Sequence, residues 1–289
     1  MRSLLFVPGD SERKMEKGLA SGADVLLLDL EDSVSLPNKE AARALTACLL
    51  RTAAKDGPRL FVRVNDLRSG FTDADLAAVM PAAPAGIMLP KAVGLRDVEQ
   101  LATKLRVHEA EHGLEDGGTQ ILPIITETPA AVLAAIGWSG RHARMVGLTW
   151  GAEDLSAEIG VERTRTEDGA LTDVFRLARA VTVLAAAASE VAAIDTVFVD
   201  FRDDAALRRE CENAARDGFT GKMAIHPGQV AAINEAFTPS AEALAHARSV
   251  VDAFAAAGNP GVVGIDGKMF DRPHLKRAQR LLGRVAPTG

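Results

Sequence analysis

Two acidic residues far apart in the sequence are the best candidates for holding a hard metal ion. Glu127 precedes Thr128 and Pro129, which are expected to cap and open a helix, so its side chain should remain outside that helix. Asp154 follows segment 147–151, whose glycines would let the backbone approach a ligand. Carboxylates without a companion His or Cys cluster favour an ion such as Mg²⁺, which takes one or two carboxylates plus water and substrate. The alternative for either acid is an N-cap or a surface ion pair.

Other polar residues follow short apolar runs in the same way, and acids predominate among them. Several acids that lie close together would resist ionisation unless cations compensate their negative charge, and Arg63 and Lys91 are too few to do so. A bound cation would resolve this imbalance. The polar residues are Asp29, Glu31, Asp32, Arg63, Asn65, Lys91, Glu153, Asp200 and His226.

Some of these residues have an alternative role that the sequence leaves open. The three acids of segment 29–32 are expected to orient Arg63 and metal-bound water rather than to take part directly in catalysis. His226, which precedes Pro227, could touch a substrate or could hold its loop by a backbone hydrogen bond. Lys91 could meet a substrate carboxylate, but a lysine there can equally balance the neighbouring acids. We therefore do not include Lys91 in the predicted site.

The elements that must position these residues are βα units. Eight short runs rich in Val, Ile, Leu and Phe recur, with helix-like spacing between them, which is the pattern of strands buried on both faces. Eight repeats fit a (β/α)8 TIM barrel, whose strand ends converge over one mouth, better than an open doubly wound sheet with a glycine-rich first turn. The predicted strands are 3–7, 24–30, 59–64, 86–90, 120–125, 145–149, 196–201 and 222–225, and the predicted helices include 38–54, 95–111, 130–138, 173–190 and 203–215.

The last fifty residues exceed what such a barrel needs. We predict a barrel and catalytic domain over 1–238 and a C-terminal helical extension over 239–289. The extension is predicted to hold a helix, a turn at 258–261, a short strand at 262–265 and a basic amphipathic helix from Arg272.

Composition excludes several classes of protein. A chain of 289 residues with 47% hydrophobic content can bury a sizeable core, and a net charge of −6 with 4% aromatic residues argues against a nucleic-acid partner. The apolar start ends at Pro8, which favours a first strand over a signal peptide, and no run is long enough for a membrane span. Cys48 and Cys211 lack disulfide or metal-type spacing, which suits a reducing cytoplasm. The absence of tyrosine leaves carboxylates, His and Lys for acid/base chemistry.

The residues at the predicted strand ends form a set of motifs that together resemble a known family. The chain resembles the citrate lyase beta-subunit-like proteins of the aldolase and citrate lyase superfamily, alongside malyl-CoA and citramalyl-CoA lyases. The match covers nearly the whole length, and its motifs are specific in combination. They are Leu5-Phe6-Val7-Pro8-Gly9, Leu28-Asp29-Leu30-Glu31-Asp32-Ser33-Val34, Val62-Arg63-Val64-Asn65, Met88-Leu89-Pro90-Lys91, Glu127-Thr128-Pro129, Gly151-Ala152-Glu153-Asp154, Ala224-Ile225-His226-Pro227 and Gly267-Lys268-Met269.

The resemblance implies a barrel that assembles as a trimer or a dimer of trimers, with Mg²⁺ held by Glu127 and Asp154. It implies that Arg63 holds a thioester carbonyl. It further implies that Asp266 is an acid/base group supplied to a neighbouring subunit, which would make the extension a lid. The residues implied to line the acyl-thioester path are Phe6, Val7, Lys17, Ile225 and His226.

The implied activity is that of a Mg²⁺-dependent carbon–carbon lyase. It would cleave or form a 3-hydroxyacyl-CoA thioester, with a 2-keto acid and acetyl-CoA or a short acyl-CoA as the other side of the reaction. The alternatives are a malyl-CoA-type thioesterase and a non-autonomous citryl lyase subunit that acts on an acyl-carrier-protein thioester. A barrel acting on free hydroxy-keto acids is a third, against which the long extension argues. Some relatives carry an arginine at the position of Ser11, so only Arg13, Lys14 and Lys17 are left here to meet CoA phosphates.

Overall fold

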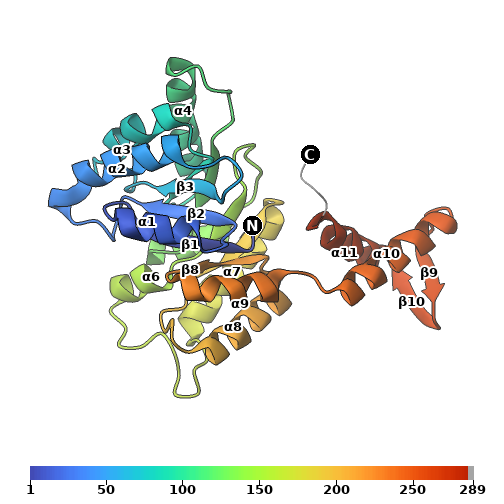
Figure 1. Ribbon diagram of the computed structural model, residues 1–289. Coiled ribbons are helices and arrows are strands. Elements are labelled where there is room, and N and C mark those ends of the chain that lie inside the picture. The colour runs from blue at the N-terminus through green and yellow to red at the C-terminus, as the bar shows by residue number, and fades with distance from the viewer. Residues whose placement is uncertain (286–289) are drawn as a thin grey trace. The chain divides into compact units, whose positions relative to one another are not determined.

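Eight parallel strands form the sheet of the first part of the chain in the computed structural model, which describes residues 1–285 (Figure 1). The strand order is β5-β4-β3-β2-β1-β8-β7-β6, and parallel bridges from Ile121 to Met145 and from Ile124 to Thr149 join the two ends, closing the barrel. The (β/α)8 prediction is therefore confirmed. The strands are β1 Ser3–Pro8, β2 Val25–Asp29, β3 Arg59–Arg63, β4 Gly86–Leu89, β5 Gln120–Pro123, β6 Gly147–Thr149, β7 Ala192–Asp195 and β8 Gly221–Ala224.

Helices alternate with these strands, and the five predicted ranges agree with the observed ones to within a few residues. In the described part of the chain, no helix is both long and apolar enough to cross a membrane. The helices of this part are α1 Glu12–Leu19, α2 Lys39–Thr52, α3 Thr72–Val79, α4 Leu95–Glu111, α5 Pro129–Ala135, α6 Ala152–Ile159, α7 Asp173–Ala188, α8 Asp204–Asp217 and α9 Val230–Phe237, with short 3₁₀ turns η1 Leu36–Asn38, η2 Met80–Ala82 and η3 Pro227–Gln229.

The barrel is filled by alternate strand residues, as the two-residue period of a strand requires. Phe61 of β3 is the largest side chain of the inner cluster and is fully buried. It fits because the neighbouring strand β4 has Gly86 beside it, where an added Cβ would lie 1.8 Å from the Phe61 ring. The other inner residues are Leu4, Val25, Leu27, Met88, Leu122, Ile124, Ile194 and Met223.

The predicted seventh strand is wrong. The range 196–201 is irregular, and β7 is instead the preceding segment Ala192–Asp195. Alanine has a low preference for strands, but this segment lies between β6 and β8 and pairs with both, so tertiary pairing decides the outcome. The apolar residues that suggested a strand lie beyond its C-terminal end, and two of them, Val199 and Phe201, are exposed. Asp200, predicted to end this strand, is an exposed loop residue.

The chain divides into two compact units, Met1–Phe237 and the part from Thr238 onward. In the second unit α10 (Ala241–Ala256) and α11 (Arg272–Gly283) pack with an antiparallel hairpin of β9 (Val262–Ile265) and β10 (Lys268–Asp271). Asp266 and Gly267 form the hairpin turn, both with positive φ, +48° and +74°. Both helices and the first strand agree with the prediction from the sequence, whereas β10 was not predicted.

Candidate active site

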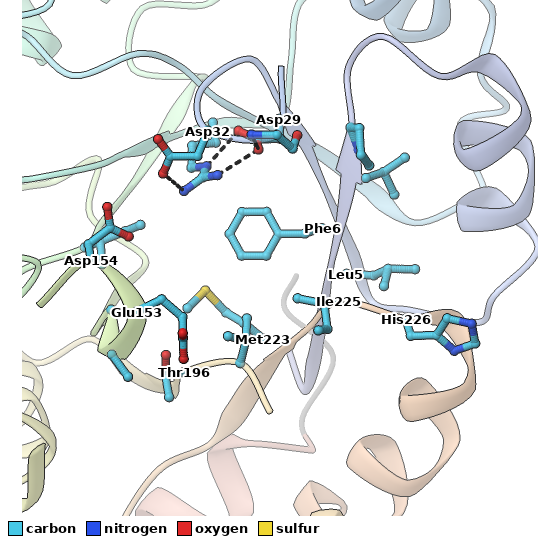
Figure 2. A pocket seen from close by; sticks show the side chains of 18 of the residues that line it. Leu5, Phe6, Asp29, Asp32, Glu153, Asp154, Thr196, Met223, Ile225 and His226 are labelled. Carbon is cyan, nitrogen blue, oxygen red and sulfur yellow. Dashed lines mark hydrogen bonds and ion pairs between the residues drawn. The ribbon is translucent and has the colours of Figure 1, made fainter. Parts of the chain in front are cut away.

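A pocket of about 650 Å³ opens at the C-terminal ends of the strands and gathers most of the predicted site residues. Figure 2 shows Phe6 in its middle, with Asp29 and Asp32 on one side and Met223 and Ile225 on the other. Asp266 belongs to the second unit and is exposed. The predicted site residues that line the pocket are Phe6, Val7, Lys17, Asp29, Asp32, Arg63, Glu127, Asp154, Ile225 and His226.

Arg63, at the end of β3, is only 9% exposed, and its guanidinium group is fixed by several contacts. Its Nε and Nη2 atoms donate to the two carboxylate oxygens of Asp29, each at 2.7 Å, and its guanidinium carbon lies 4.8 Å from the centroid of the Phe6 ring. Nη1 lies 3.0 Å from Glu31 and 3.4 Å from Asp32. Burial alone would lower the pKa of Arg63, but these acids outweigh it and raise the pKa. The residue is therefore a permanent, fixed cation facing the pocket.

Glu127 is 1% exposed and stays outside α5, as the sequence predicts. Thr128 caps that helix, its hydroxyl accepting from the Ala131 N–H at 3.1 Å, and Pro129 begins it. The Glu127 side chain lies against Gly151, where a Cβ would come 2.6 Å from its Cγ, so this glycine makes room for the acid. Burial, together with the charges of Asp154 and Glu31, raises the pKa of Glu127 to about 8.

Asp154 lies in the first turn of α6, with its side chain 27% exposed, and faces the same pocket as Glu127. Gly151 stands at the N-cap of α6 and Thr128 at that of α5, so the N-cap alternative is wrong for both acids. The ion-pair alternative describes part of the geometry, because Asp154 lies 3.5 Å from the ammonium of Lys91.

Lys91, which was not part of the predicted site, contacts several acids of the mouth. It follows β4 in a left-handed conformation, with φ +52°, and its backbone N–H donates to Glu127 at 2.5 Å. Its ammonium donates to Glu31 at 2.6 Å. Burial lowers the pKa of Lys91, but the nearby acids more than compensate and raise it. The signal that pointed to this residue was its position directly after a predicted strand, yet its partners could be seen only in the fold.

The mouth still carries more acid than base. Burial raises the pKa of Glu31 to about 7, since Arg63 and Lys91 offset only part of the cost of burying its charge. Asp29 differs, because Arg63 outweighs its burial and lowers its pKa. Four carboxylates, those of Asp29, Glu31, Asp32 and Asp154, are therefore paired with only two cations, Arg63 and Lys91, and Glu127 and Glu153 of the pocket lining add to the excess of acid. Glu127 and Asp154 offer the oxygen donors that a hard divalent ion prefers. The donor set fits Mg²⁺.

The side of the pocket that lies across Phe6 from Asp29 and Asp32 is an apolar and basic rim. Lys14 and Lys17 project from α1 as exposed pocket residues, and Ile225 is 40% exposed. His226 accepts at Nδ1 from the Gly228 N–H at 3.1 Å, so it does hold its loop, and its ring also lines the pocket. That ring stacks on Phe201 with the centroids 4.7 Å apart.

The chain matches the HpcH/HpaI aldolase/citrate lyase family over residues 2–227, which confirms the resemblance seen in its motifs. Citrate lyase subunit beta of Leuconostoc mesenteroides subsp. cremoris is 32% identical over 97% of this chain and 92% of that protein. The mitochondrial citramalyl-CoA lyase of Rattus norvegicus is 34% identical over 97% of this chain and 85% of that protein. The crystal structure of CitE from Mycobacterium tuberculosis with magnesium, acetoacetate and coenzyme A has a TM-score of 0.75 at 34% identity, over 98% of this chain and 97% of that one. The chain therefore belongs to the HpcH/HpaI aldolase/citrate lyase family and is a lyase of the citrate lyase beta and citramalyl-CoA lyase type.

Proposed function

We propose that the protein is a Mg²⁺-dependent carbon–carbon lyase that cleaves, or in reverse forms, a 3-hydroxyacyl-CoA thioester. The products of cleavage are a 2-keto acid and acetyl-CoA or a short acyl-CoA. The observation that carries the proposal is one pocket in which the acid pair Glu127 and Asp154 and the fixed cation Arg63 are lining residues. The M. tuberculosis relative, crystallised with magnesium, acetoacetate and coenzyme A, supports the same class of ligand.

Glu127 and Asp154 would hold the metal ion. When bound, Mg²⁺ would act as a Lewis acid toward the carbonyl and carboxylate oxygens of the keto acid. The protein's contribution is to keep both carboxylates in place. Gly151 and the Lys91 N–H fix the Glu127 side chain, and α6 carries Asp154.

Arg63 would stabilise the negative charge that develops on the thioester oxygen as the carbon–carbon bond breaks and an enolate forms. A fixed cation in a partly dry site typically contributes several kcal/mol to lowering such a barrier. The two hydrogen bonds that Asp29 accepts and the stacked ring of Phe6 keep the guanidinium oriented before the reaction begins. We assign the acids of segment 29–32 this orienting role.

The apolar and basic rim would receive the thioester. Phe6, Val7 and Ile225 offer apolar contacts to the acyl chain, and Lys17 and His226 lie toward the outer part of this lining. Coenzyme A phosphates are the ligands we expect for the exposed lysines of α1. An acyl-carrier-protein thioester is the alternative partner.

Asp266 would act as the acid/base group. In cleavage it would give a proton to the enolate carbon, and in the reverse direction it would take that proton up. We propose that the C-terminal extension, residues 239–289, serves as a lid that brings this aspartate to the barrel of a neighbouring subunit in a trimer or a dimer of trimers. Asp266 is suited to such a role by its position, since it is exposed at the tip of a tight hairpin turn.

The deciding experiment is an assay of the purified chain with Mg²⁺ on a panel of malyl, citramalyl, citryl and other 3-hydroxyacyl-CoA thioesters, with keto acid and free thiol measured separately. Keto acid without free thiol supports the lyase, free thiol marks a thioesterase, and turnover only on a carrier-protein thioester marks a citryl lyase subunit. Asp154→Ala should abolish Mg²⁺-dependent turnover with the fold retained. The control is Glu158→Gln, an exposed position on the same helix.

For Asp266→Asn we expect cleavage to fall by orders of magnitude while Mg²⁺ binding is unchanged. Mixing this variant with the Asp154→Ala chain tests the sharing of sites between subunits. Mixed oligomers should regain some activity, because an intact lid can then meet an intact barrel. A near-normal rate for Asp266→Asn would mean that the proton donor lies elsewhere.

A further inference from the structure

The C-terminal end of α4, outside the barrel mouth, carries three side chains with metal-binding chemistry. They are His108, Glu111 and His112, and one ligand atom from each lies within 4.8 Å of the others. The two imidazole planes are nearly parallel, 5° apart, with centroids separated by 6.2 Å. His108 Nδ1 lies 3.6 Å from a Glu111 oxygen, is shielded from solvent, and has no hydrogen-bond partner within the described chain.

The spacing explains why these side chains converge. Residues three and four apart lie on one face of a helix, so positions 108, 111 and 112 form a single cluster. Two histidines four residues apart on a helix are a recognised zinc-binding arrangement. Tetrahedral ligands at 2.0–2.1 Å from zinc would lie about 3.3 Å apart, so small side-chain rotations would suffice. The negative end of the helix dipole also favours a cation at this end.

The helix turn that carries the cluster is anchored from its other side. Glu109 is 1% exposed and accepts two hydrogen bonds from Arg144, each at 2.6 Å. It also accepts from the backbone N–H groups of Gly117 and Thr119, both at 3.0 Å. One turn earlier on the helix, the ammonium of Lys104 donates to Asp73 at 2.6 Å, so the positive charge of Lys104 is already paired with an acid. The ligands are thus presented by a fixed backbone.

We propose that His108, Glu111 and His112 bind one transition-metal ion of the Zn²⁺ class, at a site separate from the acid pair of the mouth. Two imidazoles and one carboxylate suit Zn²⁺ better than Mg²⁺, which prefers oxygen ligands alone. A water molecule would fill the fourth position of a tetrahedral site.

The site binds metal without supporting hydrolysis. Residues 108–112 have the sequence His-Glu-Ala-Glu-His. Metalloproteases with two histidines at this spacing use the glutamate that follows the first histidine as a general base. Here the Glu109 side chain is buried in the protein interior. Both of its carboxylate oxygens accept hydrogen bonds, from Arg144 and from the backbone N–H groups of Gly117 and Thr119. Because these hydrogen bonds occupy both oxygens of a side chain that is only 1% exposed, Glu109 is not placed to act as a general base at the cluster.

The test is zinc titration of the metal-stripped protein by calorimetry, in saturating Mg²⁺ and in an Asp154→Asn background that removes the competing acid pair. We compare His108→Gln and His112→Gln with His246→Gln, which removes an exposed histidine of α10. Co²⁺, whose visible spectrum distinguishes tetrahedral nitrogen-containing sites, is the second probe. Thermal melting without metal checks that each variant folds.

We expect one equivalent of Zn²⁺ to bind with a micromolar or lower dissociation constant in the reference protein and in His246→Gln. Either cluster variant should bind at least tenfold more weakly and lose the tetrahedral Co²⁺ spectrum. Equal binding by the reference and the cluster variants, or no binding at millimolar Zn²⁺, would overturn the proposal. In the otherwise wild-type chain, His112→Gln should leave Mg²⁺-dependent lyase turnover unchanged, so this outcome is independent of the proposed function.

Discussion

Replacing Glu127 by Gln should stabilise the metal-free protein at alkaline pH and remove its response to Mg²⁺. Glu127 is 1% exposed, and its pKa is raised from 4.5 to about 8 by burial and by the nearby charges of Asp154 and Glu31. Because the folded-state pKa lies above the unfolded value, the folded protein retains a proton that the unfolded chain releases. The stability linked to Glu127 is therefore present below about pH 4.5 and is lost as the pH rises toward 8.

The size of the effect follows from the shift. At about 1.4 kcal/mol per pKa unit, moving from 4.5 to 8 makes ionised Glu127 cost up to about 5 kcal/mol of folding free energy. The glutamine side chain of the variant never ionises, so the variant avoids this cost. The difference between variant and wild type should be small at pH 4.5 and should grow to several kcal/mol above pH 8. A bound divalent cation should return most of the lost stability to the wild type alone.

The measurement is urea unfolding at pH 5 and pH 8.5, with EDTA and then with excess Mg²⁺. Glu158→Gln, the same chemical change on an exposed face of α6, should follow the wild type under all four conditions. Two results would refute the reasoning. One is equal loss of stability between pH 5 and pH 8.5 in wild type and variant, and the other is equal stabilisation of both by Mg²⁺.

Three further predictions concern neighbouring contacts. Lys91→Met removes the ammonium paired with three acids of the mouth but keeps the backbone N–H on Glu127, so we expect a lower melting temperature without metal and several-fold tighter Mg²⁺ binding by calorimetry. Gly151→Ala places a Cβ 2.6 Å from the Glu127 Cγ, so calorimetry should find weaker Mg²⁺ binding, with only a small change in the melting temperature. Glu109→Gln removes the ionised partner of Arg144 and should cost about 3 kcal/mol in urea unfolding at pH 7. Because the Glu109 pKa is lowered from 4.5 to about 2, this cost should be present above pH 4.5 and should vanish as the pH falls toward 2.

The barrel could be predicted from sequence because most strands carry their own signal. Runs such as Val25–Asp29 are buried on both faces and so contain apolar residues at successive positions. Ala192–Asp195 is a strand for a different reason, since the closed barrel needs a partner between β6 and β8 at that place. A requirement of closure is a property of the whole fold, and the more strand-like residues just after it misled the local prediction.

The site was predictable to the extent that strand ends determine it. Arg63 ends β3, and Glu127 and Asp154 come after β5 and β6, so the rule that such strand ends meet at one mouth was enough to group them. Lys91 satisfied the same rule, but its role depends on a left-handed backbone that a lysine gives no sign of adopting. The function of Glu109 was equally hidden, because its partner Arg144 lies 35 residues away.

The buried charges of this protein fall into two groups, and the difference between them indicates which one is prepared for a metal. Lys222 of β8 donates to Asp195 of β7 at 2.9 Å and to Glu210 of α8 at 2.7 Å, and the pKa of Asp195 is lowered because its partners outweigh its burial. For two acids of the mouth, Glu31 and Glu127, burial outweighs the available cations, so their pKa values are raised. Paired charges of the first kind stabilise the native state in their ionised form, whereas under-compensated acids lower its stability at neutral pH. A protein that retains such acids at the end of a barrel is less stable there than it would be with an added cation, and this physical argument supports the proposed Mg²⁺ site.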